Sequence, residues 1–405
     1  MNDLGVYVDH YGLPARDRGQ PRPQLARPSP SRELAARTRG ELRRRLRGRR
    51  LAYLDNMFPW ERSGFRYHEA LALHELAPDT LFFSLWEMTD AFPAPVHPLA
   101  RFPLLAPAAG VTDAYGVFQL FLEGVCGLRP SGGAPPDAFE GPDLSDVLAR
   151  CGIRLHGSIY PGGGFTPSPE GIARSRRLAQ RLDSTFSYVP EVLAGVPEAI
   201  AVAQAFTATG FYAETTARWR SPAPFVCLFA ADDPPRKGLD VALAAFAQLD
   251  RDAFHLHVVG PHEHRRAELP ERLATFHGWL SPSELRALHE RVHVLVSPVS
   301  AEAPEGGGMV DGFPTQAAAD AVSSGCLLVS ANPAHDHRVL EPGVHYVDCA
   351  ADPHALREAL RALAADMPGT QRLAVTGTAR LRERMDVRRG AAEKLAHMGF
   401  AVSGH

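Results

Sequence analysis

Two aspartates flank a predicted helix start between Asp311 and Gly325. Thr315 can cap the helix N-terminus, and Pro314 fixes the entry of the chain. A helix N-terminus offers unpaired backbone N–H groups and the positive end of the helix dipole, and both suit a diphosphate. Asp311 before the helix and Asp320 within it could hold the hydroxyls of a sugar and a ribose. The segment therefore predicts an anion-binding helix start between two acids.

The residues around this helix predict a complete α/β unit. Glu305–Gly308 is a glycine-rich loop that leads to the first acid. Gly325 stands where a helix would end in a left-handed residue. Cys326–Val329 is a short apolar run that suits a strand buried on both faces. The order is loop, helix, turn and buried strand.

The rest of the chain alternates predicted strands and helices of similar length. In the first half we expect strands at 51–54, 80–85, 153–156 and 184–189, and helices over 65–76, 112–125 and 170–182. In the second half we expect strands at 225–229, 255–259, 275–278, 292–296 and 345–347, and helices over 239–249, 282–290, 353–365 and 387–398. This alternation implies parallel sheets covered by helices, and 405 residues favour two domains.

Composition excludes several classes of function. A net charge of −3 gives no reason to expect a nucleic-acid partner. No run of about 18 apolar residues suggests a membrane span, and the first residues do not have the pattern of a secretory signal. Five scattered cysteines fit a reducing cytoplasm and argue against a disulfide framework or zinc cluster. We therefore expect a cytoplasmic protein.

The first 50 residues differ from the rest in charge. They hold 13 arginines against five acids, and 31–50 could form a basic helix. Such a region suits peripheral contact with an anionic membrane surface. A solvated helix or a partly disordered extension explains the same composition.

Five ordered segments of the second half resemble the family 4 glycosyltransferases of GT-B architecture. In chain order they are Arg236–Asp240, Leu256–Gly260, Phe276–Leu280, Val294–Pro298 and Asp311–Gly325. The resemblance covers about 225–365. It implies two Rossmann-like domains with parallel sheets that face each other across a cleft.

The resemblance also implies the following division of the chain. Residues 1–50 are a basic N-terminal extension, 51–205 an N-terminal acceptor-side domain, 206–224 a linker, 225–385 a C-terminal nucleotide-sugar-binding domain, and 386–405 a C-terminal helix that crosses back to the first domain.

Such enzymes move a sugar from a nucleotide diphosphate sugar to an acceptor hydroxyl, usually with retention of anomeric configuration. The resemblance implies that Lys237 neutralises the phosphates, that Asp311 faces the donor sugar, and that His156 lies near it. It implies a donor site at Gly278, Trp279, Gly312, Phe313, Pro314, Thr315 and Asp320, with His277 beside the base. On the acceptor side we expect Trp60, Glu61, Arg62 and Gly163. No cofactor or metal is expected, and the pairs His262/His264 and His335/His337 lack a third ligand nearby in the sequence.

Two departures from the family pattern leave alternatives open. The family's two acids are glutamates separated by seven residues, whereas here that spacing pairs Asp311 with Ala319, and Asp320 comes one residue later. Either the extra residue lies in the loop before the helix, or the second acid is lost. Ala231 also replaces a frequent arginine, for which Arg236 or Arg338 could substitute. The rival hypotheses are another GT-B enzyme, such as an epimerase or inverting transferase, and an inactive GT-B binding protein.

Overall fold

The structure is a computed structural model that describes residues 48–128, 140–161, 163–220, 224–231, 237–299 and 312–401. The chain forms two compact units. The first holds the described residues up to Pro59 together with 77–201 and 397–400. The second holds 60–76 and 202–396, together with Ala401. Each unit is an α/β structure built on one parallel sheet.

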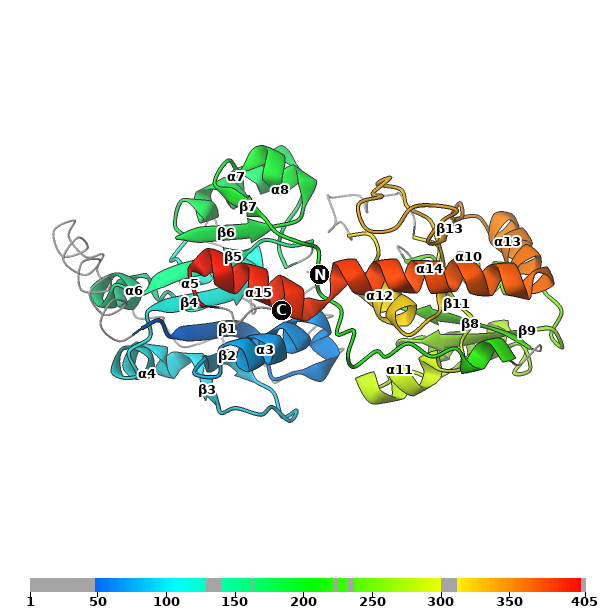
Figure 1. The fold of residues 1–405 in the computed structure, drawn as a ribbon, viewed down its shortest axis with the longest axis horizontal. Helices are drawn as coiled ribbons and strands as arrows, with labels where there is room; N and C mark the ends of the chain where they lie inside the picture. The colour runs from blue at the N-terminus through cyan, green and yellow to red at the C-terminus, as the bar shows by residue number, and fades with distance from the viewer. Residues whose placement is uncertain are drawn as a thin grey trace. The chain divides into compact units, whose positions relative to one another are not determined.

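The first unit contains a seven-stranded sheet in the order β3-β2-β1-β4-β5-β6-β7, and every neighbouring pair is parallel. Its strands lie side by side in Figure 1. In chain order they are β1 (Leu51–Phe58), β2 (Leu81–Glu87), β3 (Val96–Pro98), β4 (Asp113–Val117), β5 (Arg154–Ser158), β6 (Ser184–Ser187) and β7 (Ala199–Ala201). The helices between them are α4 (Phe102–Ala108), α5 (Gln119–Val125), α6 (Ser145–Cys151), α7 (Pro169–Ala179) and α8 (Pro190–Gly195).

The helix predicted over 112–125 is wrong in its first half. Asp113–Val117 is a strand at the sheet's centre, and only Gln119–Val125 is helical. The strand is buried along its whole length, so its side chains show neither a helical stripe nor an alternation. Phe118 separates the two elements with a φ of 76°, a left-handed conformation that no helix continues. Strand β1 also runs four residues beyond its predicted end at Leu54.

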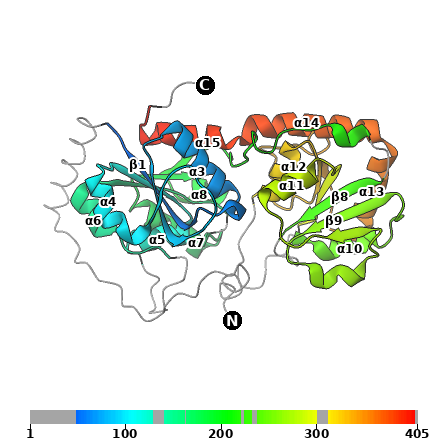
Figure 2. The same ribbon diagram turned by 90° about the horizontal axis from the view of Figure 1, so that it is seen from below.

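The second unit contains a six-stranded parallel sheet in the order β10-β9-β8-β11-β12-β13. In chain order its strands are β8 (Phe225–Ala230), β9 (Phe254–Val259), β10 (Ala274–Phe276), β11 (Val294–Ser297), β12 (Leu327–Ser330) and β13 (Val347–Asp348). Its helices are α3 (Phe65–Leu76), α10 (Leu239–Phe246), α11 (Pro282–His289), α12 (Gln316–Ser323), α13 (Pro353–Ala365), α14 (Met367–Met385) and most of α15 (Val387–Met398). Figure 2 shows α10 on one side of the sheet and α11 and α12 on the other.

Most predicted elements of the second unit are present with small shifts of their ends. Helices α13 and α15 begin and end at the predicted residues. Ser281 and Glu284 form the capping box that opens α11, as their spacing predicts. Helix α14 was not predicted, because Pro368 and Gly369 stand in its first turn and Gly377 in its interior. None of the helices within the described ranges has the length and hydrophobicity needed to cross a membrane.

One segment belongs to a different unit from the domain in which the sequence predicts it. Residues 60–76, expected in the first domain, belong to the second unit. Three contacts explain the grouping: Phe65 packs against Phe206, Glu69 pairs with Lys394, and Gly64 lies against Gln316. The predicted boundary followed the alternation of strands and helices, which does not reveal contacts between segments far apart in sequence.

Candidate functional site

The strand order of the second unit reverses between β8 and β11. The chain builds β8, β9 and β10 toward one edge and then returns to place β11 on the other side of β8. In parallel α/β sheets, ligands bind beyond the carboxyl ends of the strands at such a switch point. A ligand-binding site is therefore expected at the loops that follow β8 and β11.

These two loops touch at Gly238 and Pro298. A Cβ atom built on Gly238 would lie 2.0 Å from the carbonyl oxygen of Pro298, and Gly238 has a φ of 77°. Only glycine fits such a close approach in a left-handed conformation. The contact fixes the half-buried Lys237 at the start of α10, directly beside the switch point. The predicted phosphate-binding lysine thus lies where the topology favours a ligand.

The next two loops along the sheet edge are joined by glycines as well. A Cβ on Gly260 would lie 2.1 Å from the carbonyl oxygen of Ala231, and the Gly260 N–H donates to the carbonyl of Gly278. His262, which is fully buried, contacts the Ala231 carbonyl through Nε2 at 2.7 Å. Burial lowers the pKa of His262, so the ring is neutral and its Nε2–H donates.

The predicted base-binding turn follows β10. Gly278 has a φ of 67°, and a Cβ there would lie 2.1 Å from the Glu263 carboxylate. Trp279 comes next and is half-buried. His277 Nε2 and His257 Nδ1 are 2.9 Å apart, and burial lowers the pKa of His257 to about 3. The structure therefore brings the turns after β8, β9 and β10 into one row.

The N-terminus of α12 has the predicted cap. Thr315 Oγ1 accepts from the N–H of Ala318 at 3.4 Å, and the helix runs from Gln316 to Ser323. Gly325 follows with a φ of 94°, the left-handed ending that the sequence predicts. Helix α12 follows β11 in the chain and precedes β12, and both strands are parallel to β8. Its N-terminus therefore lies at the carboxyl edge of the sheet, like that of α10.

The residues that lead into α12 are held by two other parts of the second unit. Phe313 packs against Tyr346 with ring centroids 4.9 Å apart. Its carbonyl accepts a hydrogen bond from Gln204 Nε2 at 3.0 Å. The following Pro314 is buried, and Gly312 is half-buried. These contacts position the predicted donor-binding turn from both sides.

Asp320 lies one turn into α12 and is only 4% exposed. Gln316 Nε2 donates to its Oδ1 at 2.7 Å. Burial raises the pKa of Asp320 to about 8, and the bond from Gln316 opposes that rise. Asp320 also raises the pKa of Tyr212, whose own burial is the larger cause. The carboxyl group is therefore largely protonated at neutral pH.

The predicted acceptor residues Trp60, Glu61 and Arg62 lie in the second unit. Trp60 precedes the short 3₁₀ helix Glu61–Ser63, which ends at Gly64 against Gln316. The pKa of Glu284 is lowered mainly by its hydrogen bonds with Ser281, and the charge of Arg62 lowers it further. These residues thus lie close to the starts of α11 and α12, the predicted donor side of the protein.

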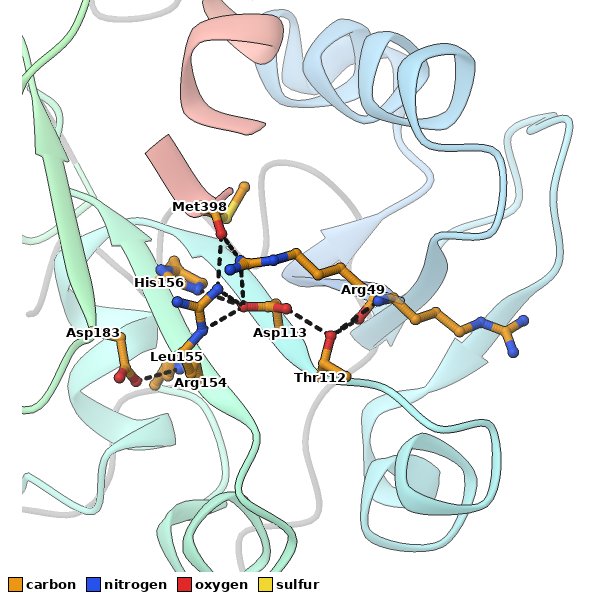
Figure 3. A network of polar contacts seen from close by, with 9 residues as sticks. Arg49, Thr112, Asp113, Arg154, Leu155, His156, Asp183 and Met398 are labelled. Carbon is orange, nitrogen blue, oxygen red and sulfur yellow. Dashed lines mark hydrogen bonds and ion pairs between the residues drawn. The ribbon is translucent and has the colours of Figure 1, made fainter. Parts of the chain in front are cut away.

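His156 lies in the first unit, in the middle of β5 rather than at a strand end. Its Nε2 is 3.1 Å from Asp113 Oδ1, and the side chain is 1% exposed (Figure 3). Asp113 opens β4, so His156 points toward the amino ends of the strands. Parallel sheets bind ligands at the opposite edge. The catalytic role predicted for His156 does not fit this position.

Asp113 is the centre of a buried network (Figure 3). Thr112 Oγ1 donates to its Oδ2 at 2.6 Å, and Arg154 Nε donates to Oδ1 at 2.7 Å. Arg154 and Arg49 both donate to the carbonyl of Met398 at the end of α15. Burial would raise the pKa of Asp113, but its bonds to His156 and Thr112 and the Arg154 charge hold it below its usual value. Through Arg49 and Met398, the network connects residues near both ends of the described chain to the first sheet.

Gly163 is the last predicted site residue in the first unit. It has a φ of 58°, and a Cβ there would lie 2.1 Å from the Phe118 ring. Its carbonyl accepts from the N–H of Leu120 at 3.0 Å. The glycine therefore allows the loop after β5 to pack on the turn after β4, at the carboxyl edge of that sheet.

Some predictions lie outside the described residues. These are Asp311, Arg236, the glycines of 306–308 and the basic region 1–47. Arg338 is described, and both carboxylate oxygens of Asp336 accept bonds from it at 2.9 and 2.6 Å. Within the described ranges, no group of three His, Cys, Asp or Glu side chains could hold a metal ion.

Sequence reasoning missed Gln316 and Gly64. The four-residue spacing of Gln316 and Asp320 on a helix was the available signal for the first. No signal in the sequence pointed to the contact of Gly64 with Gln316, because the two residues are far apart in the chain.

Comparison with known proteins supports the resemblance over the same region. Residues 224–366 match the protein family described as Glycosyl transferases group 1. This segment contains Lys237, the Gly278 turn and all of α12. No curated protein matches the chain.

Solved structures share the fold. HepE of Anabaena, in complex with UDP and glucose, is 16% identical, with a TM-score of 0.60 over 86% of this chain and 100% of that one. Sucrose-phosphate synthase of Thermosynechococcus elongatus is 12% identical, with a TM-score of 0.61 over 86% and 98%. A glycosyltransferase of Rickettsia africae is 8% identical, with a TM-score of 0.60 over 86% and 97%. These likenesses confirm the predicted fold class, a GT-B-like pair of parallel-sheet α/β domains.

Proposed function

We propose that this protein is a glycosyltransferase that uses a nucleotide diphosphate sugar as donor. The observation that carries the proposal is the overlap of two independent features. The segment that matches the glycosyltransferase family is also the part of the second unit where Lys237 and the N-terminus of α12 lie at the carboxyl edge of the sheet. HepE of Anabaena, which shares the fold, was solved with UDP-glucose.

In the proposed reaction the bond between the anomeric carbon and the diphosphate oxygen breaks. The acceptor oxygen forms the new bond to that carbon and passes its proton to the departing diphosphate oxygen, and configuration is retained. The main demand is to stabilise the negative charge that develops on the leaving diphosphate. Lys237 supplies a cation, and α12 adds a dipole that contributes about 0.3–1 kcal/mol at an exposed helix end. We assign Asp311, which lies outside the described residues, to the donor sugar, and Asp320 to hydrogen bonds from the ribose.

A second candidate is a nucleotide-sugar-binding protein without transferase activity. The observation that favours it is Ala231, which replaces the family's frequent arginine and whose carbonyl is occupied by His262. Arg338 lies in the ion pair with Asp336, which speaks against its acting as the substitute.

Incubation of the full-length protein with UDP-, GDP-, ADP- and TDP-sugars tests the proposal. We expect slow release of nucleoside diphosphate from one of them, measured by a coupled nucleotide assay, and faster release with a suitable acceptor. Lys237→Ala should reduce the rate at least about tenfold, while the exposed-site control Arg251→Ala should not change it. Anomeric analysis of the product by NMR tests retention. Binding of a nucleotide sugar without any release would favour the second candidate.

A further inference from the structure

Gln316 is the first residue of α12 after the Thr315 cap. Its side chain lies on the same helix face as Asp320, one turn away. The amide Nε2 donates to Asp320 Oδ1 at 2.7 Å. Asp320 is buried, whereas Gln316 is only partly buried. Gln316 is therefore the more accessible of the two side chains.

The other end of this amide has no partner. Gln316 Oε1 is buried and accepts no hydrogen bond among the described residues. Buried acceptors in native proteins are normally paired, so an unpaired one needs an explanation. A ligand hydroxyl that donates to Oε1 would supply the missing bond. The buried oxygen thus points to a ligand rather than to a purely structural amide.

The position of Gln316 is held by a third segment. A Cβ built on Gly64 would lie 3.3 Å from Gln316 Cγ, and Gly64 has a φ of 62°. The stem of the glutamine therefore lies against the backbone at the end of the Glu61–Ser63 turn. This contact limits the conformations open to Gln316 and keeps its amide next to Asp320.

We propose that Gln316 is a positioning and specificity residue for the ribose of the donor nucleotide. Its Nε2 holds the Asp320 carboxylate as an acceptor for one ribose hydroxyl, and its Oε1 accepts from the neighbouring hydroxyl. The inference rests on the proposed function, because it assigns a role within the same donor site. It adds a residue that the family resemblance does not supply.

The pH dependence of this arrangement follows from the groups around it. Gln316 faces Asp320 from their own helix. Tyr212 couples electrostatically to Asp320 and to Glu61. His68 and His289 pack on the Tyr212 ring, and burial lowers their pKa values to about 4 and about 3, so both are neutral near pH 7.

Loss of the Gln316 bond removes the interaction that lowers the pKa of Asp320. Asp320 would then stay protonated to a higher pH, and nucleotide binding through the carboxylate would need a higher pH.

Titration calorimetry on the full-length protein tests the inference. The probes are UDP, GDP and ADP, each paired with its 2′-deoxy form, between pH 6.5 and 9. For the base that binds, the wild type should prefer the ribonucleotide by about tenfold, the effect of one hydrogen bond to a charged group. In Gln316→Met, which keeps the side-chain length, the preference should fall to about twofold and the pH profile of affinity should move upward. Gln180→Met, at an exposed site in the first unit, should change neither property.

A second variant keeps the test informative if Gln316→Met does not fold. Gln316→Glu keeps the shape and places a second carboxyl group beside Asp320, so its nucleotide affinity should fall as pH rises. If both variants keep the wild-type ribose preference and pH profile, the inference is wrong although the proposed function stands. If the wild type binds none of the nucleotides, the proposed function itself fails, and the role of Gln316 fails with it.

Discussion

At the residue scale, Asp320 is the most perturbed acid among the described side chains. It is buried, it has one hydrogen-bond partner, and its pKa is raised to about 8. A group of this kind binds a proton in the folded protein that it lacks in the unfolded chain at neutral pH. Raised pKa values of this origin are frequent where proteins bind ligands. The residue therefore links the proposed donor site to the pH dependence of stability.

We predict that Asp320→Asn flattens the pH dependence of unfolding. The folded pKa of about 8 lies above the ordinary value of 3.8, so the folded state binds more protons between these limits and its stability falls as pH rises. The neutral His68 and His289 contribute the same slope to the wild type and to the variant, so their contribution cancels in the comparison. Urea unfolding from pH 6.5 to 8 should show the wild type losing about 1 kcal/mol per pH unit relative to the variant. If the free energy of unfolding changed with pH equally in the wild type and the variant, Asp320 would not be a buried ionisable group.

At the element scale, close contacts of glycine backbones organise the carboxyl edge of the second sheet. Gly238 contacts the Pro298 carbonyl, Gly260 contacts the Ala231 carbonyl, and Gly278 lies against Glu263. All three have positive φ values. Larger residues at these positions would push apart loops that belong to neighbouring strands. The geometry of the proposed site thus depends on turns rather than on the sheet itself.

Gly238→Ala tests this dependence. The variant introduces both backbone strain and a clash with Pro298, so it should lower the free energy of unfolding by about 2 kcal/mol or more and abolish nucleotide binding. Gly343→Ala is the matched control, since Gly343 has a φ of 72° but no atom within 4 Å of the added Cβ. The control should cost only about 1 kcal/mol, measured by chemical denaturation. Equal losses for the two variants would show that the Pro298 contact is unimportant.

The sequence predicted elements well where local signals agreed. Caps and periodicity placed α11, α12, α13 and α15 to within a residue or so. The signals were misleading at Thr112–Val117, where burial on both faces hides the strand pattern, and at α14, where Pro and Gly suggest a turn. The predicted site residues that follow strands of the second sheet lie at its carboxyl edge. The position of His156 was predicted wrongly, because its partner Asp113 is 43 residues away in the chain.

At the scale of the whole molecule, ion pairs join segments that are distant in sequence. Glu69 on α3 pairs with Lys394 on α15, and both side chains are only 3% exposed. Arg49 and Met398 meet at the Asp113 network of the first unit. The first pair lies within the second unit and explains why Trp60–Leu76 belongs there. Contacts of this kind decide which segments belong to the same unit. The alternation of strands and helices along the chain does not predict such contacts.

Breaking the Glu69–Lys394 pair should destabilise the protein strongly. Lys394→Met or Glu69→Leu alone removes one member of this buried ion pair and leaves the other charge buried, and each should lower the free energy of unfolding by about 3–5 kcal/mol. The double variant Glu69→Leu/Lys394→Met buries no charge and should recover most of the loss. A double-mutant cycle by urea denaturation measures the coupling. Additive losses in the cycle would mean that the two side chains do not interact.

In the proposed function the second unit binds a nucleotide diphosphate through Lys237 and the start of α12. Titration calorimetry of the full-length protein with UDP, GDP, ADP and TDP at pH 8 measures this binding. We expect saturable one-site binding of at least one nucleotide, lost or weakened at least about tenfold in Lys237→Ala and unchanged in Arg251→Ala. The absence of binding to all four, or equal affinity in wild type and Lys237→Ala, would contradict this proposal.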